Sequence, residues 1–259
     1  MHISYSELKQ WAECPWKHKL VYRDRIKKFV GNEYTAFGRA LHLLCENLIE
    51  DKIEDEEQDD FFELAFEKEI MDLMAKEVDL NEKMINDMIE QARNISPKII
   101  PQVVKYFDNY KVFSVEERLM LPIKELESLD YEFKGYIDLV LKTDDGKYHI
   151  IDWKTCSWGW DAKKRSDKYI TYQLTLYKKF FCQKHNIDPK LVETHFALLK
   201  RTAKKDHVEI FRVTSGPRKV KNATELLVKG VKTIQSGVHF KNRNSCGYCE
   251  FKNTEHCPR

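Results

Sequence analysis

The sequence lacks several features that would place it in a particular class at once. No stretch of its 259 residues approaches the roughly 20 consecutive apolar residues of a transmembrane helix. The N-terminus, MHISYSELKQWAECPWKHK, is too polar and aromatic for a secretory signal peptide. The seven cysteines are an odd number, which argues against complete pairing in disulfides. We therefore expect a cytoplasmic protein without a membrane partner, whose cysteines indicate metal binding or reactive thiols before disulfides.

A large charge excess is also missing. The formal net charge is only +2 at pH 7, which by itself indicates no nucleic-acid partner. The distribution is uneven, since residues 50–60 carry eight acids and one lysine, whereas residues 200–243 carry twelve Lys and Arg against three Asp and Glu. A local basic excess is typical of a phosphate-facing surface, and equally of a solvated face, so charge alone leaves both interpretations open.

Hydrophobic periodicity predicts a chain that is mostly helical up to residue 110 and then alternates strands with helices. Helical spacing is found over 4–14, 34–50, 61–77, 82–110 (with breaks at Pro97 and Pro101), 168–185 and 217–236. Strand patterns cover 112–123, 131–142, 147–155, 193–202 and 207–214. Strands set among helices predict an α/β fold. Because no repeat or linker interrupts the chain, we expect one domain over 1–259, composed of a helical part (1–110), a sheet core (111–215) and a helix with a Cys-rich tail (216–259).

A predicted hairpin within residues 131–155 brings three charged side chains to one patch. Its three-residue loop, Asp144 to Gly146, puts glycine at the left-handed position where it is preferred. Residues whose numbers sum to 290 then face one another, so Asp138 lies opposite Asp152. Because side chains alternate along a strand, Lys154 shares a face with Asp152.

Two carboxylates and an ammonium group among apolar strand residues are costly unless they are paired or bind a cation. Carboxylate oxygens suit Mg²⁺ or Mn²⁺, which would lower the pKa of a bound water and offset charge on a phosphorane-like transition state. The lysine could orient the attacking water or stabilise that charge. The alternative is a buried Asp–Lys ion pair beside a turn-associated aspartate, and geometry alone leaves it open.

Six short motifs follow one another from residue 4 to residue 258. G-Y-I-D (135–138) and I-I-D-W-K-T (150–155) form the hairpin; the others run from Ser6 to Cys14-Pro15, from Gly38 to His42, from Gln173 to Tyr177, and from Cys246 to Cys249 with Cys257-Pro258. In this order they resemble the RecB-like branch of the PD-(D/E)XK nuclease superfamily, including its phage- and CRISPR-associated exonucleases. The resemblance implies a restriction-endonuclease-like core, with a central mixed sheet flanked by helices, and a metal-dependent DNA nuclease activity.

The resemblance also implies roles for individual residues. It makes Asp138 and Asp152 metal ligands, with His42 as a third ligand and the backbone carbonyl of Trp153 as a fourth. Lys154 would be the catalytic lysine, while Gln173 and Tyr177, four apart on one helical face, would contact DNA or support the site. Glu116 or Glu117 would be a candidate for supporting the site or holding a second metal ion. Without the resemblance, His42 would be interpreted as a core histidine, and Gln173 and Tyr177 as ordinary helix residues.

The cysteines have a specific spacing, Cys246-x2-Cys249-x7-Cys257, and Cys14 or His256 could supply a fourth ligand. From spacing alone, structural Zn²⁺ is at least as well supported as an iron–sulfur cluster. The iron–sulfur members of the resembled branch use one N-terminal Cys-Pro and three C-terminal cysteines. The resemblance therefore implies a [4Fe–4S] cluster on Cys14, Cys246, Cys249 and Cys257, which would tie the first helix to the last segment.

Two basic segments are candidates for DNA contact. The first interleaves aromatic and basic side chains, as single-strand binding surfaces do, and contains Trp158, Lys163, Lys164 and Arg165. The second begins at Lys200 and Arg201 and could equally be a charged turn. No helix-turn-helix or zinc-finger pattern is present, so base-specific recognition is not expected.

The sequence thus predicts a PD-(D/E)XK-type hydrolase, most simply an exonuclease on DNA ends or single strands in recombination, repair or phage DNA processing. It would act in a prokaryotic or phage-infected cell, alone or with a recombination or helicase partner protein. Two alternatives remain: a non-catalytic DNA-end-binding or iron–sulfur scaffold protein with the same fold, and an iron–sulfur redox sensor.

Overall fold

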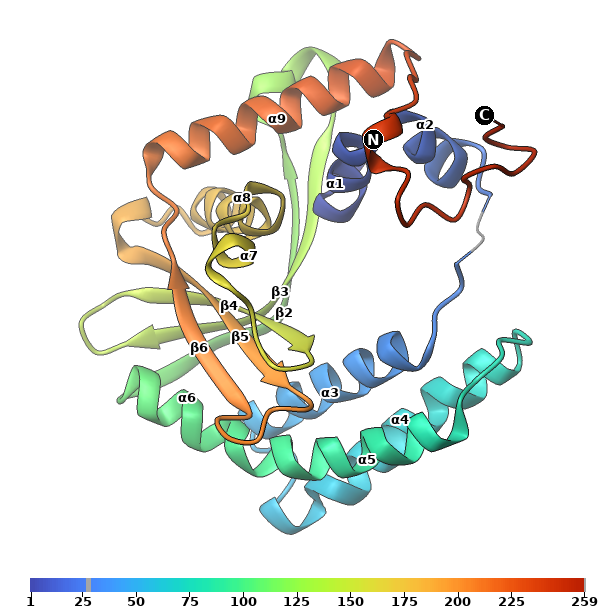
Figure 1. The fold of residues 1–259 in the computed structure, drawn as a ribbon. Coiled ribbons are helices and arrows are strands. Elements are labelled where there is room, and N and C mark those ends of the chain that lie inside the picture. Colours follow the sequence, from blue (N-terminus) through green and yellow to red (C-terminus); the bar gives the residue numbers. More distant parts are fainter. Residues whose placement is uncertain (27–28, 259) are drawn as a thin grey trace. The chain divides into compact units, whose positions relative to one another are not determined.

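The structure, a computed structural model, describes residues 1–26 and 29–258 (Figure 1). The chain divides into two compact units. Unit 1 comprises Met1–Val30, Leu119–Gly135 and Gly216–Arg259, and unit 2 comprises Gly31–Arg118 and Tyr136–Ser215. Within the described ranges, no helix is both long and apolar enough to cross a membrane. That residues 1–259 act as one domain stays a prediction.

Unit 2 is built on a mixed sheet. Four of its strands follow one another in space, namely β3 (Glu132–Thr143), β4 (Tyr148–Cys156), β5 (Val192–Lys200) and β6 (Val208–Val213). The β3–β4 and β5–β6 pairs are antiparallel, whereas β4 and β5 are parallel. A further strand, β2 (Tyr110–Pro122), pairs with β3.

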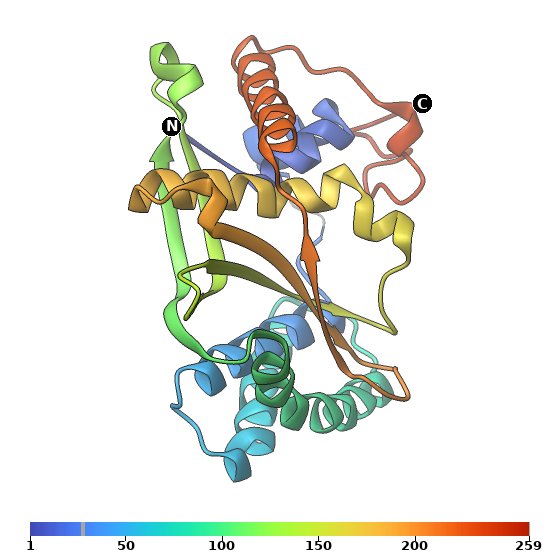
Figure 2. The same ribbon diagram turned by 90° about the vertical axis from the view of Figure 1, so that its left-hand side faces the viewer.

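Helices cover both faces of this sheet (Figure 2). On one face lie α3 (Glu33–Ile49), α4 (Gln58–Met74), α5 (Glu82–Ile95) and α6 (Ile99–Phe107). Alternate strand residues pack into that helical layer, among them Leu139, Ile151, Trp153 and Leu199. The other face is covered by α8 (Lys168–His185), which contacts β4 and β5. The predicted mixed α/β architecture, a central sheet flanked by helices, is confirmed.

Short elements complete unit 2. The helix predicted over 82–110 is divided by a 3₁₀ turn, Ser96–Lys98, as expected from Pro97. Proline at 101 is tolerated because it lies in the first turn of α6, where its missing N–H is not needed. The sequence did not predict α7 (Ala162–Ser166), which is capped by Asp161. Two more 3₁₀ turns are Asp55–Glu57 and Pro189–Leu191.

The predicted hairpin register is confirmed. Leu139 pairs with Ile151 and Lys142 with Tyr148, so paired numbers sum to 290. The loop from Asp144 to Gly146 has glycine at φ +80°, the left-handed conformation that favours a residue without a Cβ.

Unit 1 contains the first and last segments of the chain. A short strand, β1 (His2–Ser4), pairs in parallel with the start of β3. The helix predicted over 4–14 begins one residue later as α1 (Tyr5–Glu13), because Ser4 is its N-cap and accepts a hydrogen bond from the Glu7 N–H at 3.2 Å. The remaining elements are α2 (Pro15–His18), a π-helical turn (Lys19–Arg23), 3₁₀ turns at Lys124–Leu129 and Arg243–Ser245, and α9 (Pro217–Gln235).

Close packing of α1 against α9 depends on Gly230. A Cβ at this position would lie 2.6 Å from Leu8 Cδ1 and 3.2 Å from Trp11 Cε3. We expect Gly230→Ala to lower the free energy of unfolding by about 1–3 kcal/mol, the usual range for overpacking. Urea denaturation measures this, with Lys229→Ala on the exposed side of α9 as the control, expected to change stability by less than about 0.5 kcal/mol. Equal free energies of unfolding for the two variants would contradict the assigned role of Gly230 in the packing of α1 against α9.

Candidate active site

The hairpin carries the first three predicted site residues. Asp152 is almost fully buried on β4, and its Oδ2 forms an ion pair with Lys154 Nζ. On β3, Asp138 Oδ2 accepts a hydrogen bond of 2.7 Å from the backbone N–H of Trp153. The peptide between Asp152 and Lys154 therefore fixes the carboxylate of Asp138, and the structure brings the three side chains together.

Helices on both sides of the sheet add the other predicted residues. His42 of α3 places Nδ1 3.8 Å from Asp138 Oδ2. From α8, Gln173 donates from Nε2 to Asp152 Oδ1 at 2.9 Å and to the Tyr177 hydroxyl at 3.1 Å. The amide thus orients the Asp152 carboxylate, and Tyr177 in turn orients the amide.

Helix α3 approaches β4 closely at Gly38. A Cβ at Gly38 would lie 3.4 Å from Thr155 Oγ1, at van der Waals contact. Because Gly38 is one turn before His42, this approach sets how near the imidazole comes to the carboxylates.

Only one of the two neighbouring glutamates faces this site. Glu116 on β2 has a positive φ of +46°, which is uncommon for a residue with a side chain. Burial, followed by the charges of Asp138, Glu46 and Asp152, raises the pKa of Glu116 to about 7. Glu117 instead accepts hydrogen bonds from Ser114, His185 and Lys184. The sequence could not show which of the two glutamates faces the site, because no local pattern predicts the left-handed backbone conformation at Glu116.

The electrostatics of the site are those of crowded acids. Burial raises the pKa of Asp138, and burial together with the Asp138 charge raises the pKa of Asp152 to about 6, against the opposing effect of Lys154. Burial and the nearby Lys154 lower the pKa of His42 to about 4, so its imidazole is neutral at pH 7. Three acids and a neutral imidazole form a donor set that a divalent cation would stabilise, and one ammonium group lies beside them.

The donor atoms of this set stand further apart than the ligands of a bound ion would. Among the described histidine, cysteine, aspartate and glutamate residues, three ligand atoms lie within 4.8 Å of one another only at His149, Glu193 and His195. At the hairpin, Lys154 Nζ forms an ion pair with Asp152 Oδ2, one of the proposed ligand atoms. Binding a cation there would require the side chains to move closer together.

Glu117, which faces away from the site, connects β2 to α8 through its hydrogen bonds. Burial raises the pKa of Glu117, but hydrogen bonds from Ser114, His185 and Lys184 outweigh this effect and hold the pKa below its ordinary value. The stabilisation from a lowered pKa is present above the unfolded-state pKa and is lost as the pH falls through the folded-state pKa.

We therefore expect Glu117→Gln to lower the free energy of unfolding at pH 7 by about 1–3 kcal/mol, because Lys184 loses the negative charge of its acceptor. The difference from the wild type should shrink at acid pH, as the pH falls through the lowered folded-state pKa of the wild-type carboxyl. Urea denaturation at both pH values measures this. An unchanged difference at low pH would contradict the assignment of the effect to the ionised carboxylate.

The first basic segment lies just beyond the active-site strand. Trp158 is 77% exposed, and Lys163 and Lys164 on α7 are also exposed. Arg165 is instead held by Glu209 Oε1 at 2.7 Å. A cavity of about 520 Å³ is lined by Tyr34, Thr155, Cys156, Ser157, Trp158, Gly159, Lys164 and Arg201.

The second basic segment is more constrained than its sequence suggested. Lys200 is buried, with Nζ 3.4 Å from Glu209 Oε2. Arg201 donates to Gln91 Oε1 at 3.0 Å, and its guanidinium lies over the Tyr34 ring at 4.8 Å from the centroid. Sequence reasoning missed Tyr34, because no local pattern marks a tyrosine that a distant arginine will cover.

In unit 1, the four predicted cluster cysteines line one cavity of about 310 Å³. They are Cys14, Cys246, Cys249 and Cys257. Burial raises the pKa of Cys257, and the charges of the other three thiols raise it further. The backbone N–H of Asn242 donates to Cys14 Sγ at 3.4 Å, and Cys246 Sγ lies 3.8 Å from the Asn242 carbonyl. His256, the alternative ligand, is not among the residues lining this cavity.

Comparison with known proteins identifies the family. The model of the PD-(D/E)XK nuclease superfamily matches residues 2–257, and the chain therefore belongs to this superfamily. Its members are nucleases that use divalent metal ions, and the superfamily predicted from the sequence is confirmed. The narrower assignment to the RecB-like branch stays a prediction. Among curated proteins, none matches the chain.

Solved structures agree at the level of the fold. A proposed exonuclease from Eubacterium rectale is 16% identical, with a TM-score of 0.57, over 96% of this chain and 86% of that chain. The structure of SSO0001 is 14% identical, with a TM-score of 0.43, over 96% of this chain and 83% of that chain. The first likeness concerns the fold alone, and the second is too distant to add to the argument.

Proposed function

We propose that the protein is a metal-dependent deoxyribonuclease of the RecB-like branch, acting as an exonuclease on DNA ends or single strands. The observation that carries this proposal is the gathering of Asp138, Asp152 and Lys154 on one hairpin. Recombination, repair or phage DNA processing in the cytoplasm of a prokaryotic or phage-infected cell is the proposed setting. A recombination or helicase protein is the proposed partner.

The residues that would hold Mg²⁺ or Mn²⁺ are His42, Asp138, Asp152 and the carbonyl of Trp153, with Glu116 beside them. A bound ion would lower the pKa of a water ligand and offset charge on the phosphate. The donor set supports this assignment, because the acids have raised pKa values when they face one another with only Lys154 to balance them. A divalent cation would return them to their ionised forms.

The other groups act by position and charge. Lys154 holds an ammonium group against Asp152, where it can stabilise negative charge that develops on a phosphate oxygen. Gln173 holds Oδ1 of Asp152 and so fixes the direction of the carboxylate. The N–H of Trp153 does the same for Asp138. Such fixed partners hold a site in the geometry that the reaction needs.

DNA would enter along the first basic segment. The exposed indole of Trp158 offers a surface on which a base can stack, and the exposed ammonium groups of Lys163 and Lys164 can meet phosphates. Arg201 lines the same cavity as Trp158. We assign a smaller part to Arg165 and Lys200, because Glu209 holds both.

We further propose that Cys14, Cys246, Cys249 and Cys257 hold a [4Fe–4S] cluster. Four thiolates around one zinc ion, at about 2.3 Å each, require sulfur atoms about 3.8 Å apart. No three of these thiols lie within 4.8 Å of one another in the part of the chain that is described. As at the hairpin, the side chains would have to move closer together to hold a single ion, so the proposal of a [4Fe–4S] cluster rests on the family resemblance and on the shared cavity.

End-labelled DNA tests the proposed activity. Single-stranded and duplex oligonucleotides, labelled at the 5′ or the 3′ end, are incubated with Mn²⁺ or Mg²⁺ beside a closed single-stranded circle. An exonuclease releases short labelled products from one end and leaves the circle intact. Cutting of the circle would assign an endonuclease instead. Binding of ends without cleavage under any of these conditions would favour the non-catalytic alternative.

A further inference from the structure

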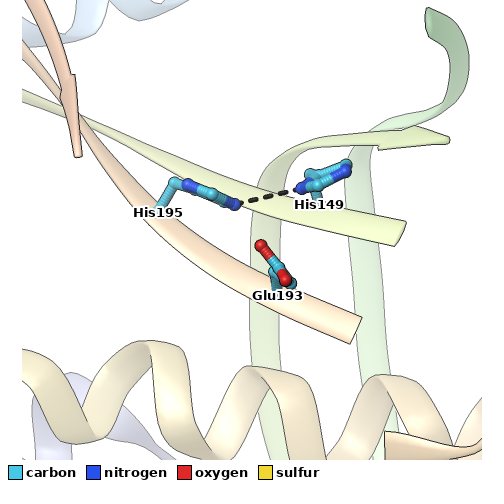
Figure 3. A group of neighbouring side chains, drawn as sticks. All are labelled: His149, Glu193 and His195. Carbon is cyan, nitrogen blue, oxygen red and sulfur yellow. Dashed lines mark hydrogen bonds between the residues drawn. The ribbon is translucent and has the colours of Figure 1, made fainter. Parts of the chain in front are cut away.

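A second group of metal-ligating side chains lies on the opposite face of the sheet from Asp152 and Lys154. It consists of His149 on β4 and of Glu193 and His195 on β5 (Figure 3). The parallel register pairs His149 with Glu193 and Ile151 with His195, so the three side chains share one face. His149 precedes Asp152 by three residues, an odd number, which puts them on opposite faces.

The spacing of the three groups suits one tetrahedral ion. Nδ1 of His149 is 3.1 Å from Nε2 of His195, and one ligand atom from each of the three residues lies within 4.8 Å of the others. An ion bound to two imidazoles at about 2.0–2.1 Å holds their nitrogens about 3.3–3.4 Å apart. The two rings are therefore within a few tenths of an ångström of that spacing.

Hydrogen bonds prepare His149 to bind through Nδ1. The Thr143 hydroxyl donates its one proton to Asp145 Oδ1 at 2.5 Å, so at 3.0 Å from Nε2 of His149 it acts as an acceptor. Nε2 then carries the ring proton, and the Nδ1 lone pair accepts a hydrogen bond from Nε2 of His195. An ion bound between the two rings would displace this proton from Nε2 of His195 to the other ring nitrogen. A ligand histidine with its other N–H held by an oxygen is the usual arrangement in metal sites.

The surroundings leave one side open. The three residues line a cavity of about 480 Å³ with Tyr106, Phe107, Asp108, Asn109, Thr143, Asp144, Asp145 and Arg212. There is room for a water molecule at a fourth position. Two cations compete for the carboxylate, since Glu193 Oε1 is 3.3 Å from Arg212 Nη2 and 3.9 Å from Lys147 Nζ. Arg212 is largely exposed, so it can swing away.

We propose that His149, Glu193 and His195 bind one Zn²⁺ ion, separately from the cation site of the nuclease. Two imidazole nitrogens and one carboxylate suit Zn²⁺, whereas the oxygen-rich hairpin site suits Mg²⁺ or Mn²⁺. The ion would connect the start of β4 to β5. Asp152 lies on β4 three residues after His149.

Calorimetric titration with Zn²⁺, in the presence of saturating Mg²⁺, tests this site on the whole protein. Four variants are compared: Glu193→Gln, His149→Gln, Arg212→Gln and the control His207→Gln, which lies in the same unit away from the cavity. Any Zn²⁺ bound by the cysteine thiols is bound equally by all four variants. Differences in Zn²⁺ affinity among the variants therefore report this site alone. Far-UV circular dichroism shows which variants are folded.

Glu193→Gln and His149→Gln should each weaken one Zn²⁺ equivalent at least 10-fold, and His207→Gln should leave it unchanged. Arg212→Gln should strengthen that equivalent, because it removes a competitor for the carboxylate. This gain would not occur if the three residues formed only a structural hydrogen-bond group. If His149→Gln does not fold, Glu193→Gln and Arg212→Gln decide the question. Equal Zn²⁺ affinities in the wild type and in both of these variants would overturn the proposal.

Discussion

Replacing Lys154 with methionine is expected to lower the rate of DNA cleavage by about 100- to 1000-fold, the usual loss when one group that stabilises transition-state charge is removed. Methionine keeps much of the aliphatic chain while removing the ammonium group that pairs with Asp152. The rate is measured on end-labelled single-stranded DNA with saturating Mn²⁺. Lys142→Met is the matched control, because Lys142 is exposed on β3 and belongs to no part of the site.

The variant Asp152→Asn separates charge from shape at the same site. It should abolish cleavage and weaken Mn²⁺ binding, whereas Lys154→Met should lose cleavage while still binding Mn²⁺. Thermal unfolding identifies any variant that is merely unstable. Cleavage at wild-type rates by both variants would remove Asp152 and Lys154 from the proposed active site. It would also leave the nuclease function of the superfamily to be carried by other residues.

The second large effect is expected at the cysteines of unit 1. Anaerobically purified wild-type protein should be brown and contain about four irons per chain, as a [4Fe–4S] cluster requires. Cys249→Ser should lose the colour and most of the iron, and it should unfold at a lower temperature because the free energy of binding the cluster contributes to folding. Cys182→Ala, a buried cysteine of unit 2, is the control and should keep the iron.

Two outcomes would contradict the cluster. A colourless protein with one zinc per chain, lost in Cys249→Ser, would assign a structural zinc site to the same cysteines. Iron retained by Cys249→Ser at the wild-type amount would exclude this residue as a ligand. Neither outcome bears on the hairpin site, so the cluster and the nuclease activity are tested independently.

Local patterns predicted the parts of the fold that depend on neighbours in sequence. The helix over 168–185 has the predicted bounds, and the hairpin register follows from its three-residue loop. Both are set by interactions over short stretches of chain. The positions of Asp138 and Asp152 could be predicted for that reason, while His42 and Gln173 required the family resemblance, because each belongs to a helix distant from the hairpin in sequence.

The features that escaped prediction depend on contacts between distant segments. The group of His149, Glu193 and His195 exists only because β4 and β5 pair in parallel, and no local pattern fixes that register. Glu116 and Glu117 could not be told apart, since the choice depends on one left-handed backbone conformation. Lys200 looked like a loop cation and is instead buried against Glu209, an ion pair formed by two paired strands.

The absence of a side chain at Gly38 also has a consequence for ion selectivity. The helix bearing His42 lies against Thr155, and a Cβ at Gly38 would already be in van der Waals contact with Thr155 Oγ1. A branched residue such as valine would push the helix away from β4 and widen the gap between His42 and Asp138. A wider gap accommodates a larger ion more easily, so Gly38→Val should change the ratio of cleavage rates with Mn²⁺ and Mg²⁺ in favour of Mn²⁺. The bulk of one side chain, remote from the phosphate, would then tune the metal preference of the enzyme.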